Sequence, residues 1–149
     1  MKEIQGQARC ALDVPRKDCF ELVAAVEDYP DWFEVVSQVE MLEAELDGTP
    51  GLARAKLYVP QSPFGQDFEL VVSVRTEPSG TVTLTRVPHG GGDEDRLEVI
   101  WRVGGTDRTE LELEFDAAAS FVPGFFPVGD VGDAIARAAI DAARAALAR

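Results

Sequence analysis

The sequence predicts an α+β fold in which a curved antiparallel sheet of about seven strands wraps around a long C-terminal helix. Residues 110–116 read Glu-Leu-Glu-Leu-Glu-Phe-Asp, an alternation that gives an extended strand one apolar and one acidic face. The same alternation recurs along most of the chain, and an Ala-rich helical pattern follows over residues 128–148. A sheet with one apolar face needs a cover, and we expect this last helix to supply it.

The first strand and two short helices are predicted from changes in apolar spacing. Apolar or small residues occupy every second position from Ile4 to Leu12, which indicates the opening strand. Pro15 suits a first helical turn, and the following apolar residues predict an amphipathic helix over residues 15–26. The segment Asp28-Tyr29-Pro30-Asp31-Trp32 should end that helix and begin a second brief turn of helix.

Further strands are predicted between turn residues, over residues 35–46, 52–60, 66–77, 80–88 and 95–103. Pro78-Ser79-Gly80 is a predicted hairpin turn, and Gly104-Gly105 leads into the strand at 110–116. Consecutive strands are usually neighbours, so the sheet should be antiparallel, within one domain that covers residues 1–149. The predicted buried stripe of the last helix consists of Val131, Ile135, Ala138, Ala142 and Ala145.

Charge and composition exclude several classes of partner. The chain has 14 Lys and Arg against 27 Asp and Glu, a net charge of -13, which repels nucleic acid and anionic headgroups. No apolar run is long enough to span a membrane, and Met1–Gly6 lacks a secretion signal, so we expect a cytoplasmic protein. One His and two separated Cys form no recognisable metal set, and we expect neither metal nor cofactor. Cys10 and Cys19 fall on apolar phases and should be buried thiols.

The Ala-rich C-terminal helix leaves two alternatives for the interior. Short side chains leave a hydrophobic cavity beneath a curved sheet, or they allow the helix to pack closely against it. Ala is also the strongest helix former, which explains its abundance without a cavity. A cavity would favour an apolar or aromatic ligand. Its candidate lining consists of Trp32, Phe33, Leu57, Phe68, Leu70, Val72, Leu84, Leu97, Val99, Trp101, Leu111, Leu113, Phe115, Phe125, Phe126, Ile135, Ala139 and Ala142.

Two motifs and two single residues, taken with the order of elements, resemble a known superfamily. The motifs are Val14-Pro15 through Phe20 and the Asp28–Trp32 segment, with Trp101 and Thr109 near expected positions on later strands. Over essentially the whole chain, the sequence resembles the START-related SRPBCC superfamily, in particular its polyketide cyclase/dehydrase and coenzyme Q-binding group. The resemblance implies the helix-grip fold. Members bind lipids, polyketides, quinones or hormones, assist chaperones, or have no known ligand, so the resemblance leaves the activity open.

The same resemblance raises the question of catalysis. Aromatase/cyclases of this superfamily place a Ser and an Arg two residues apart on a central strand, as Ser73 and Arg75 are here. There the pair is proposed to hold a polyketide oxygen and to help move protons during ring closure. The local alternation opposes such a role, because Val72 and Val74 occupy the apolar phase and Ser73 and Arg75 should face solvent.

Arg86, Tyr58 and His89 complete the polar candidates. Arg86 is in phase with the apolar residues of its strand, and projects either into the cavity toward a ligand oxygen or out at the strand end. Tyr58 is a further weak catalytic candidate. His89 lies in Pro88-His89-Gly90-Gly91-Gly92-Asp93, which is typical of a flexible hairpin loop rather than of a catalytic or phosphate-binding site.

Three functional hypotheses follow. The first is a binding protein that carries or shields a small hydrophobic molecule such as a lipid, quinone or polyketide-like compound. The second is a polyketide aromatase/cyclase that acts in the same cavity. The third is an adaptor that contacts a protein partner through the sheet edge or through Phe121, Phe125 and Phe126, which lie in the apolar link before the last helix. The sequence does not indicate an oligomeric state.

Overall fold

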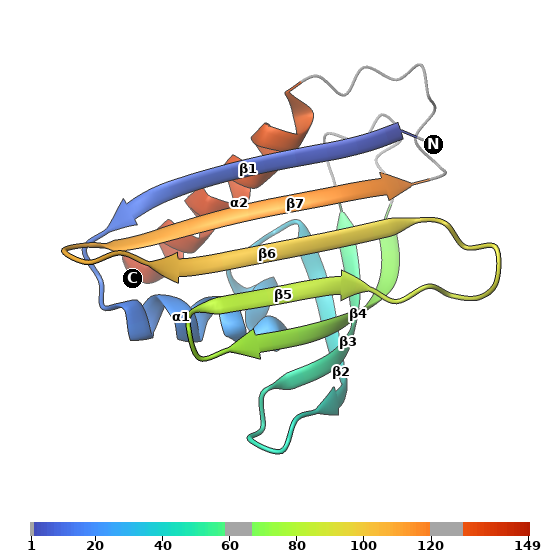
Figure 1. Ribbon diagram of the computed structural model, residues 1–149, viewed down its shortest axis with the longest axis horizontal. Coiled ribbons are helices and arrows are strands. Elements are labelled where there is room, and N and C mark those ends of the chain that lie inside the picture. Colours follow the sequence, from blue (N-terminus) through green and yellow to red (C-terminus); the bar gives the residue numbers. More distant parts are fainter. Residues whose placement is uncertain (1, 59–66, 120–129) are drawn as a thin grey trace.

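The computed structural model describes residues 2–58, 67–119 and 130–149, and a curved antiparallel sheet dominates them (Figure 1). Its strands are β1 (Lys2–Leu12), β2 (Val36–Ala44), β3 (Pro50–Tyr58), β4 (Asp67–Glu77), β5 (Thr81–Arg86), β6 (Arg96–Gly104) and β7 (Thr109–Ala119). Within these residues the strand order is β1-β7-β6-β5-β4-β3-β2, and all neighbours are antiparallel. Each strand from β2 to β6 therefore pairs with the next in sequence, as predicted.

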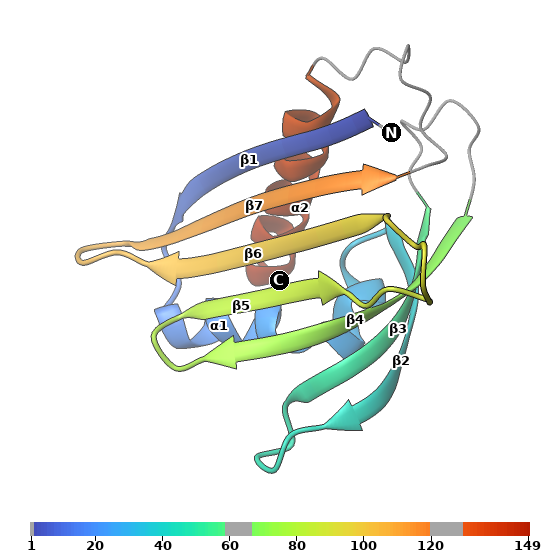
Figure 2. The ribbon, with the colours of Figure 1, turned by 45° about the vertical axis from the view of Figure 1, so that its right-hand side comes forward.

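Three helical elements lie on one side of the sheet, which we call its inner face (Figures 1 and 2). They are α1 (Arg16–Ala24), the 3-10 helix η1 (Val26–Asp31) and α2 (Val131–Leu147). The helix predicted over residues 15–26 ends earlier than expected, because Ala25 leaves helical geometry with φ −81° and ψ 71°. The second helical turn begins earlier than predicted and contains Pro30.

The predicted strands are confirmed with shifted ends. β5 stops at Arg86, two residues before its predicted end, and β7 extends from Thr109 to Ala119 rather than over residues 110–116. Gly80 and Gly105 occupy the predicted turns and have φ values of 114° and 100°, which favour glycine. Residues 59–60 and 66 of the predicted strands lie outside the described residues.

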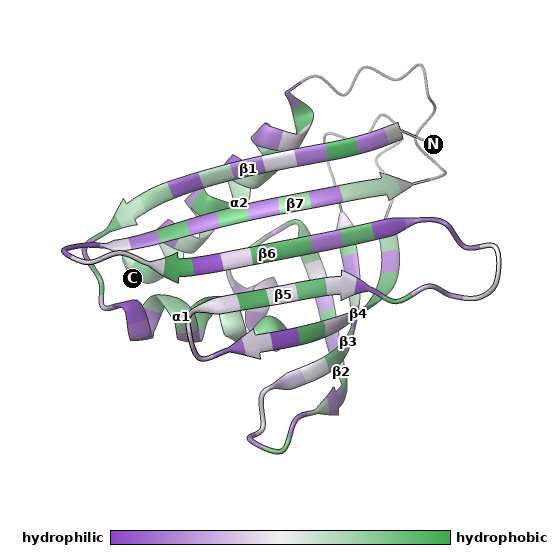
Figure 3. Cartoon of the chain, in the orientation of Figure 1, coloured by the Kyte–Doolittle hydropathy of each residue, from purple (hydrophilic) through white to green (hydrophobic). Residues whose placement is uncertain are grey.

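Alternation along the strands gives the sheet two different faces, visible as alternating bands in Figure 3. The outer face carries exposed ion pairs, in which Arg102 contacts Glu112 and Glu114 on the neighbouring strand. Exposed pairs of this kind contribute little to stability, but they mark the solvent side. The inner face carries the hydrophobic core together with the helices.

Helix α2 packs with a different stripe from the predicted one. Its buried residues are Gly132, Ala136, Ala139, Ile140 and Ala143, whereas Ala145 is exposed. Ala occurs on every side of this helix, so the apolar pattern alone does not fix its rotation. A close approach fixes it instead, because a Cβ atom on Gly132 would lie 1.8 Å from the Gln5 carbonyl oxygen.

The same helix protects the free edge of β1. The Asp133 carboxylate accepts a hydrogen bond of 3.1 Å from the Gln7 backbone N–H, and Arg137 donates one of 3.2 Å to the Arg9 carbonyl. An unprotected edge strand can pair with other chains, and these contacts occupy two of its backbone groups. In the described part of the chain, no helix has the length and apolar character needed to cross a membrane.

Candidate ligand-binding site

The inner face is covered to different extents at its two ends. We define the closed end as six inward apolar residues near the β4–β5 and β6–β7 turns: Val74, Val82, Trp101, Val103, Leu111 and Leu113. All six are buried, and Leu111 has an exposed fraction of 0%. Helix α1 packs against β6 and β7 and also contacts α2. The closed end is thus an ordinary packed core.

The open end comprises inward residues near the opposite ends of β4, β6 and β7 and, beside them, of β3 and β1: Ile4, Leu57, Leu70, Leu97, Val99 and Ala117. These side chains are apolar but only partly buried. Helix α2 contacts mainly β1, with fewer contacts to β7. The open end therefore presents apolar side chains that the described helices cover incompletely.

An aromatic cluster lies between η1 and the sheet. Trp32 directly follows η1, and its ring meets Trp101 of β6 edge-on with a centroid separation of 6.2 Å. Tyr29 also meets Trp32 edge-on at 5.1 Å, while Phe33 stacks on it at 5.9 Å. Phe33 is only partly buried, so the cluster extends from the packed core to a ring with some solvent exposure.

A hydrogen bond and burial fix the position and the protonation state of Tyr29. Its hydroxyl donates to the Val23 carbonyl at 2.5 Å, which ties η1 to α1. Burial raises the pKa of the phenol far above its ordinary value, the nearby Trp101 indole opposes that rise, and the Glu27 charge adds to it. The Trp101 N–H influences the hydroxyl without reaching hydrogen-bond geometry. Tyr29 is therefore a neutral structural group at physiological pH.

Three buried polar atoms have no hydrogen-bond partner among the residues that the structure describes: Trp32 Nε1, Trp101 Nε1 and Thr76 Oγ1. Trp101 is 2% exposed and Trp32 is 9% exposed. Thr76 lies on the same row of the sheet as Trp101, because both pair with Val82 of β5. An unsatisfied buried polar group costs about 1–3 kcal/mol, so these three atoms require an explanation.

Arg86 projects on the inner face, but its guanidinium is already paired. It contacts the Asp93 carboxylate at 2.7 and 3.1 Å and donates to the Asp95 carbonyl at 2.8 Å. Asp93 also accepts from the backbone N–H groups of His89 and Asp95. These bonds hold the Asp93 pKa far below its ordinary value, and the same pairing raises the Arg86 pKa. Neither predicted role of Arg86 describes this arrangement, in which it anchors the loop between β5 and β6.

The other polar candidates lie on the outer face. The Arg75 side chain is 76% exposed and contacts Glu77, and the Ser73 hydroxyl lies 3.4 Å from the Thr85 carbonyl. Tyr58 is 41% exposed. A catalytic role for these three residues inside the fold would need inward side chains, and the strand alternation turns them away.

The remaining predicted lining residues divide between the core and its margin. Val72, Leu84, Phe115 and Ala139 are buried, while Phe68, Ile135 and Ala142 are partly buried. Phe125 and Phe126, together with Phe121 of the adaptor hypothesis, lie outside the described residues. The structure thus brings most of the predicted lining to one face without testing its role in binding.

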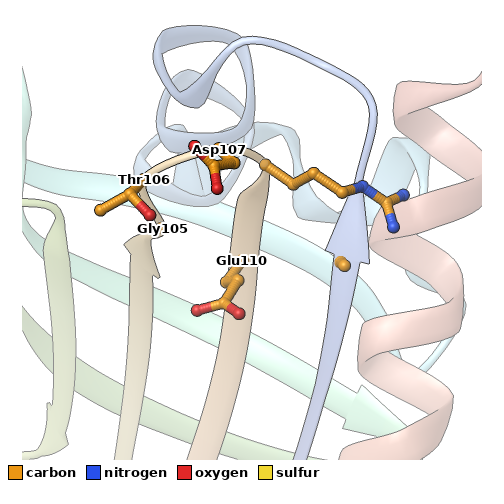
Figure 4. A pocket seen from close by; sticks show the side chains of 6 residues that line it. Gly105, Thr106, Asp107 and Glu110 are labelled. Atoms are coloured by element: carbon orange, nitrogen blue, oxygen red, sulfur yellow. The ribbon is translucent and has the colours of Figure 1, made fainter.

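Two hollows open on the outside of the described residues. One surrounds the β6–β7 turn and is lined by Ala11, Arg108 and the residues labelled in Figure 4, namely Gly105, Thr106, Asp107 and Glu110. The other lies beside β1 and α2, with Gln5, Gln7, Glu114, Asp116 and Asp133 among its lining. Both are polar and shallow, so neither suits an apolar ligand.

Metal and thiol chemistry find little support in the described residues. Within them, no cluster of three His, Cys, Asp or Glu side chains could hold a metal ion. Cys19 is buried and Cys10 is partly buried, and both are free thiols. Burial, with a smaller contribution from Cys10, raises the pKa of the Cys19 thiol to about 12. Cys19 is therefore a core residue, not a nucleophile.

A family model described as polyketide cyclase/dehydrase and lipid transport matches residues 12–147, nearly the whole chain. The chain belongs to this family. The Thr109 hydroxyl of this family member donates to the Val14 carbonyl, which joins the start of β7 to the link before α1. Thr109 and the Val14–Phe20 motif, which were far apart in sequence, thus meet in one contact. A comparison with curated proteins found no significant match.

Solved structures show the fold of this polyketide cyclase/dehydrase family protein. A START superfamily protein from Mycobacterium smegmatis has a TM-score of 0.70 at 18% identity, with 97% of this chain and 94% of that chain covered. The Zhui aromatase/cyclase from Streptomyces sp. R1128 gives 0.70 at 19%, covering 99% and 95%. A STAR-related lipid transfer protein from Xanthomonas axonopodis gives 0.68 at 14%, covering 96% and 85%. The predicted helix-grip fold is confirmed.

Sequence reasoning missed two features of this interior. Thr76 continues the inward phase of Val72 and Val74, so alternation alone would have identified it as a buried hydroxyl. The Arg86–Asp93 pair joins residues seven positions apart across a Gly-rich loop, and no periodic pattern indicates such a contact. The first miss was avoidable, whereas the second depends on the loop conformation.

Proposed function

We propose that this protein binds a small hydrophobic molecule against the open end of the inner face and carries or shields it. The observation that carries the proposal is the partial burial of six apolar side chains on a face whose other end is fully packed. A ligand that covered them would remove apolar surface from water, at about 25 cal/mol per Å². The family description, which includes lipid transport, supports the same class of ligand.

Polyketide cyclisation is the second candidate, supported by the similarity to the Zhui aromatase/cyclase. It needs polar side chains directed at the substrate. Of the four polar candidates, Ser73, Arg75 and Tyr58 are exposed on the outer face, and Arg86 is neutralised by Asp93. These positions favour carriage over cyclisation. The free cysteines support a reducing compartment such as the cytoplasm as the place of action.

Native mass spectrometry of protein purified from its source tests the binding proposal. We expect a co-purified molecule, or micromolar binding of members of a hydrophobic ligand panel. Leu97→Glu should abolish this binding because it places a charge on the open end. Ile100→Glu adds the same charge to the outer face of the same strand and should leave binding intact. A protein that is empty and ignores the whole panel would contradict the proposal.

A further inference from the structure

We propose that the free edge of β2 is a docking site for a basic, extended segment of a partner protein, which adds a strand to the sheet. This activity is independent of hydrophobic binding at the open end. Helix α2 contacts the β1 edge through Asp133 and Arg137. In the described part of the chain, by contrast, the only β2 backbone group bonded outside β3 is the Val36 N–H, which donates to the Phe33 carbonyl. Unpaired backbone groups along an edge can accept an added strand.

The hairpin of β2 and β3 carries apolar side chains that the core does not use. Met41, Leu42 and Leu52 are partly buried, yet among the described residues they belong neither to the core nor to the side chains packed against it. Leu46, in the turn between the two strands, is fully exposed. Figures 1 and 2 show this turn projecting away from the helices. These side chains are therefore available to a partner.

Hydrogen bonds hold the turn that presents Leu46. The Glu45 N–H donates to the Thr49 carbonyl at 2.8 Å, and the Gly48 N–H donates to the Glu45 carbonyl at 2.9 Å. The Asp47 carboxylate accepts from the N–H and the hydroxyl of Thr49, at 3.0 and 2.6 Å. Because the turn is already ordered, a partner that buries Leu46 avoids most of the entropy cost of fixing it.

Charge selects the occupant of this edge. Residues 40–49 contain no Lys, Arg or His and carry four carboxylates, those of Glu40, Glu43, Glu45 and Asp47. Among the described residues, only Glu40 of these four has a cationic partner, Arg54 of β3 at 3.0 Å. Two copies of this chain paired through β2 would bring these carboxylates together, and like charges on adjacent strands are destabilising. A basic segment meets opposite charge instead.

The register of β2 predicts the side-chain pattern of the added strand. Between two bulges, β2 pairs regularly with β3 from Gln38 to Met41. In this run Val39 and Met41 lie opposite two buried alanines of β3 and face inward, whereas Gln38 and Glu40 face outward. A neighbouring strand continues the same alternation. We therefore expect apolar side chains beside Val39 and Met41, alternating with Lys or Arg beside Gln38 and Glu40.

Three short peptides of equal length test the inference. One alternates Lys and Val, the second alternates Glu and Val, and the third is the Lys–Val peptide N-methylated throughout, which keeps the side chains and charge but removes the backbone donors. We expect the first peptide to bind about tenfold more tightly than either of the others. Its binding should slow hydrogen exchange at the β2 amides from Gln38 to Met41 and leave the β1 amides unchanged.

Matched charge reversals separate docking at β2 from general attraction to an acidic protein. Glu43→Lys and Glu110→Lys change the net charge by the same amount, and both side chains are exposed, the second on β7. We expect Glu43→Lys to weaken binding of the Lys–Val peptide about fivefold, and Glu110→Lys to leave it within about twofold. Leu46→Ser should weaken the same binding about threefold, because it removes apolar contact area.

Several results would overturn the inference: no binding of the Lys–Val peptide, equal binding of its N-methylated form, unslowed exchange at the β2 amides, or equal effects of the two charge reversals. A dimer of the free protein that protects the same amides would also overturn it, because the occupant would then be a second copy. Binding of an apolar probe such as 2-isopropylnaphthalene should be the same in Glu43→Lys as in the unmodified protein. If that probe fails to bind either protein, the proposed function is contradicted while docking at β2 stands.

Discussion

The closed and open ends of the inner face share the strands β4, β6 and β7 and the same alternation, yet they differ in cover. Leu111 and Leu97 both project inward from the paired strands β7 and β6, and only Leu111 is fully buried. At the closed end α1 packs against β6 and β7. At the open end the short side chains of α2 lie mainly beside β1. The difference teaches that alternation determines which side chains face inward, whereas the helices determine which of them remain available to a ligand.

The largest effect on stability is expected from a substitution that disturbs the packing of α2 against β1. Gly132→Ala would place a Cβ atom 1.8 Å from the Gln5 carbonyl oxygen, so the helix must move away from β1. We expect a loss of about 3 kcal/mol in the free energy of unfolding, even after the better helix propensity of Ala is included. Urea unfolding measures it. Gly90→Ala is the matched control, since open space surrounds Gly90, and a similar loss there would contradict the explanation.

Alanine substitutions at Leu111 and at Leu97 test whether the closed and open ends differ in packing. Leu111→Ala at the closed end should cost about 3 kcal/mol of folding free energy, because it opens a cavity in a packed core. Leu97→Ala removes the same atoms from a partly covered surface and should cost about 1 kcal/mol. Ligand affinity should respond in the opposite order, with Leu97→Ala weakening it more. Equal losses of stability in urea unfolding would show that the two ends are packed alike.

The anchor of the loop between β5 and β6 should respond to pH. The pKa of Asp93 is lowered in the folded protein, so its contribution is present above the ordinary carboxyl pKa of about 4 and is lost as the pH falls below it. Asp93→Asn should mimic this loss at neutral pH, and the His89 and Asp95 amides should exchange hydrogen about tenfold faster. Unchanged exchange in the variant would mean that other contacts hold the loop.

The smallest effect is expected on the outer face. Arg75→Ala removes an exposed side chain that contacts Glu77, so the free energy of unfolding should change by less than about 0.5 kcal/mol. Ligand affinity should also stay unchanged, measured by titration with 2-isopropylnaphthalene. A marked loss of binding, or of any cyclase activity, would show that this strand turns Arg75 inward in solution.

The strands were predictable because their residues alternate regularly, with Ile100 on the outer face of β6 as an exception. The rotation of α2 was not, because Ala carries no directional information and the decisive contact is between Gly132 and the β1 backbone. The alternation along β4 predicted that the side chains of Ser73 and Arg75 are exposed. It could not predict that Arg86 would be neutralised by Asp93, since that pairing depends on the fold of a Gly-rich loop.

The most direct test of an open binding surface is a methyl NMR titration with 2-isopropylnaphthalene. Our account predicts that the signals of Leu97, Val99 and Leu70 shift on binding, while those of Leu111, Leu113 and Val82 stay in place. Shifts concentrated at the closed end or on the outer face, or no shifts at saturating probe, would contradict it.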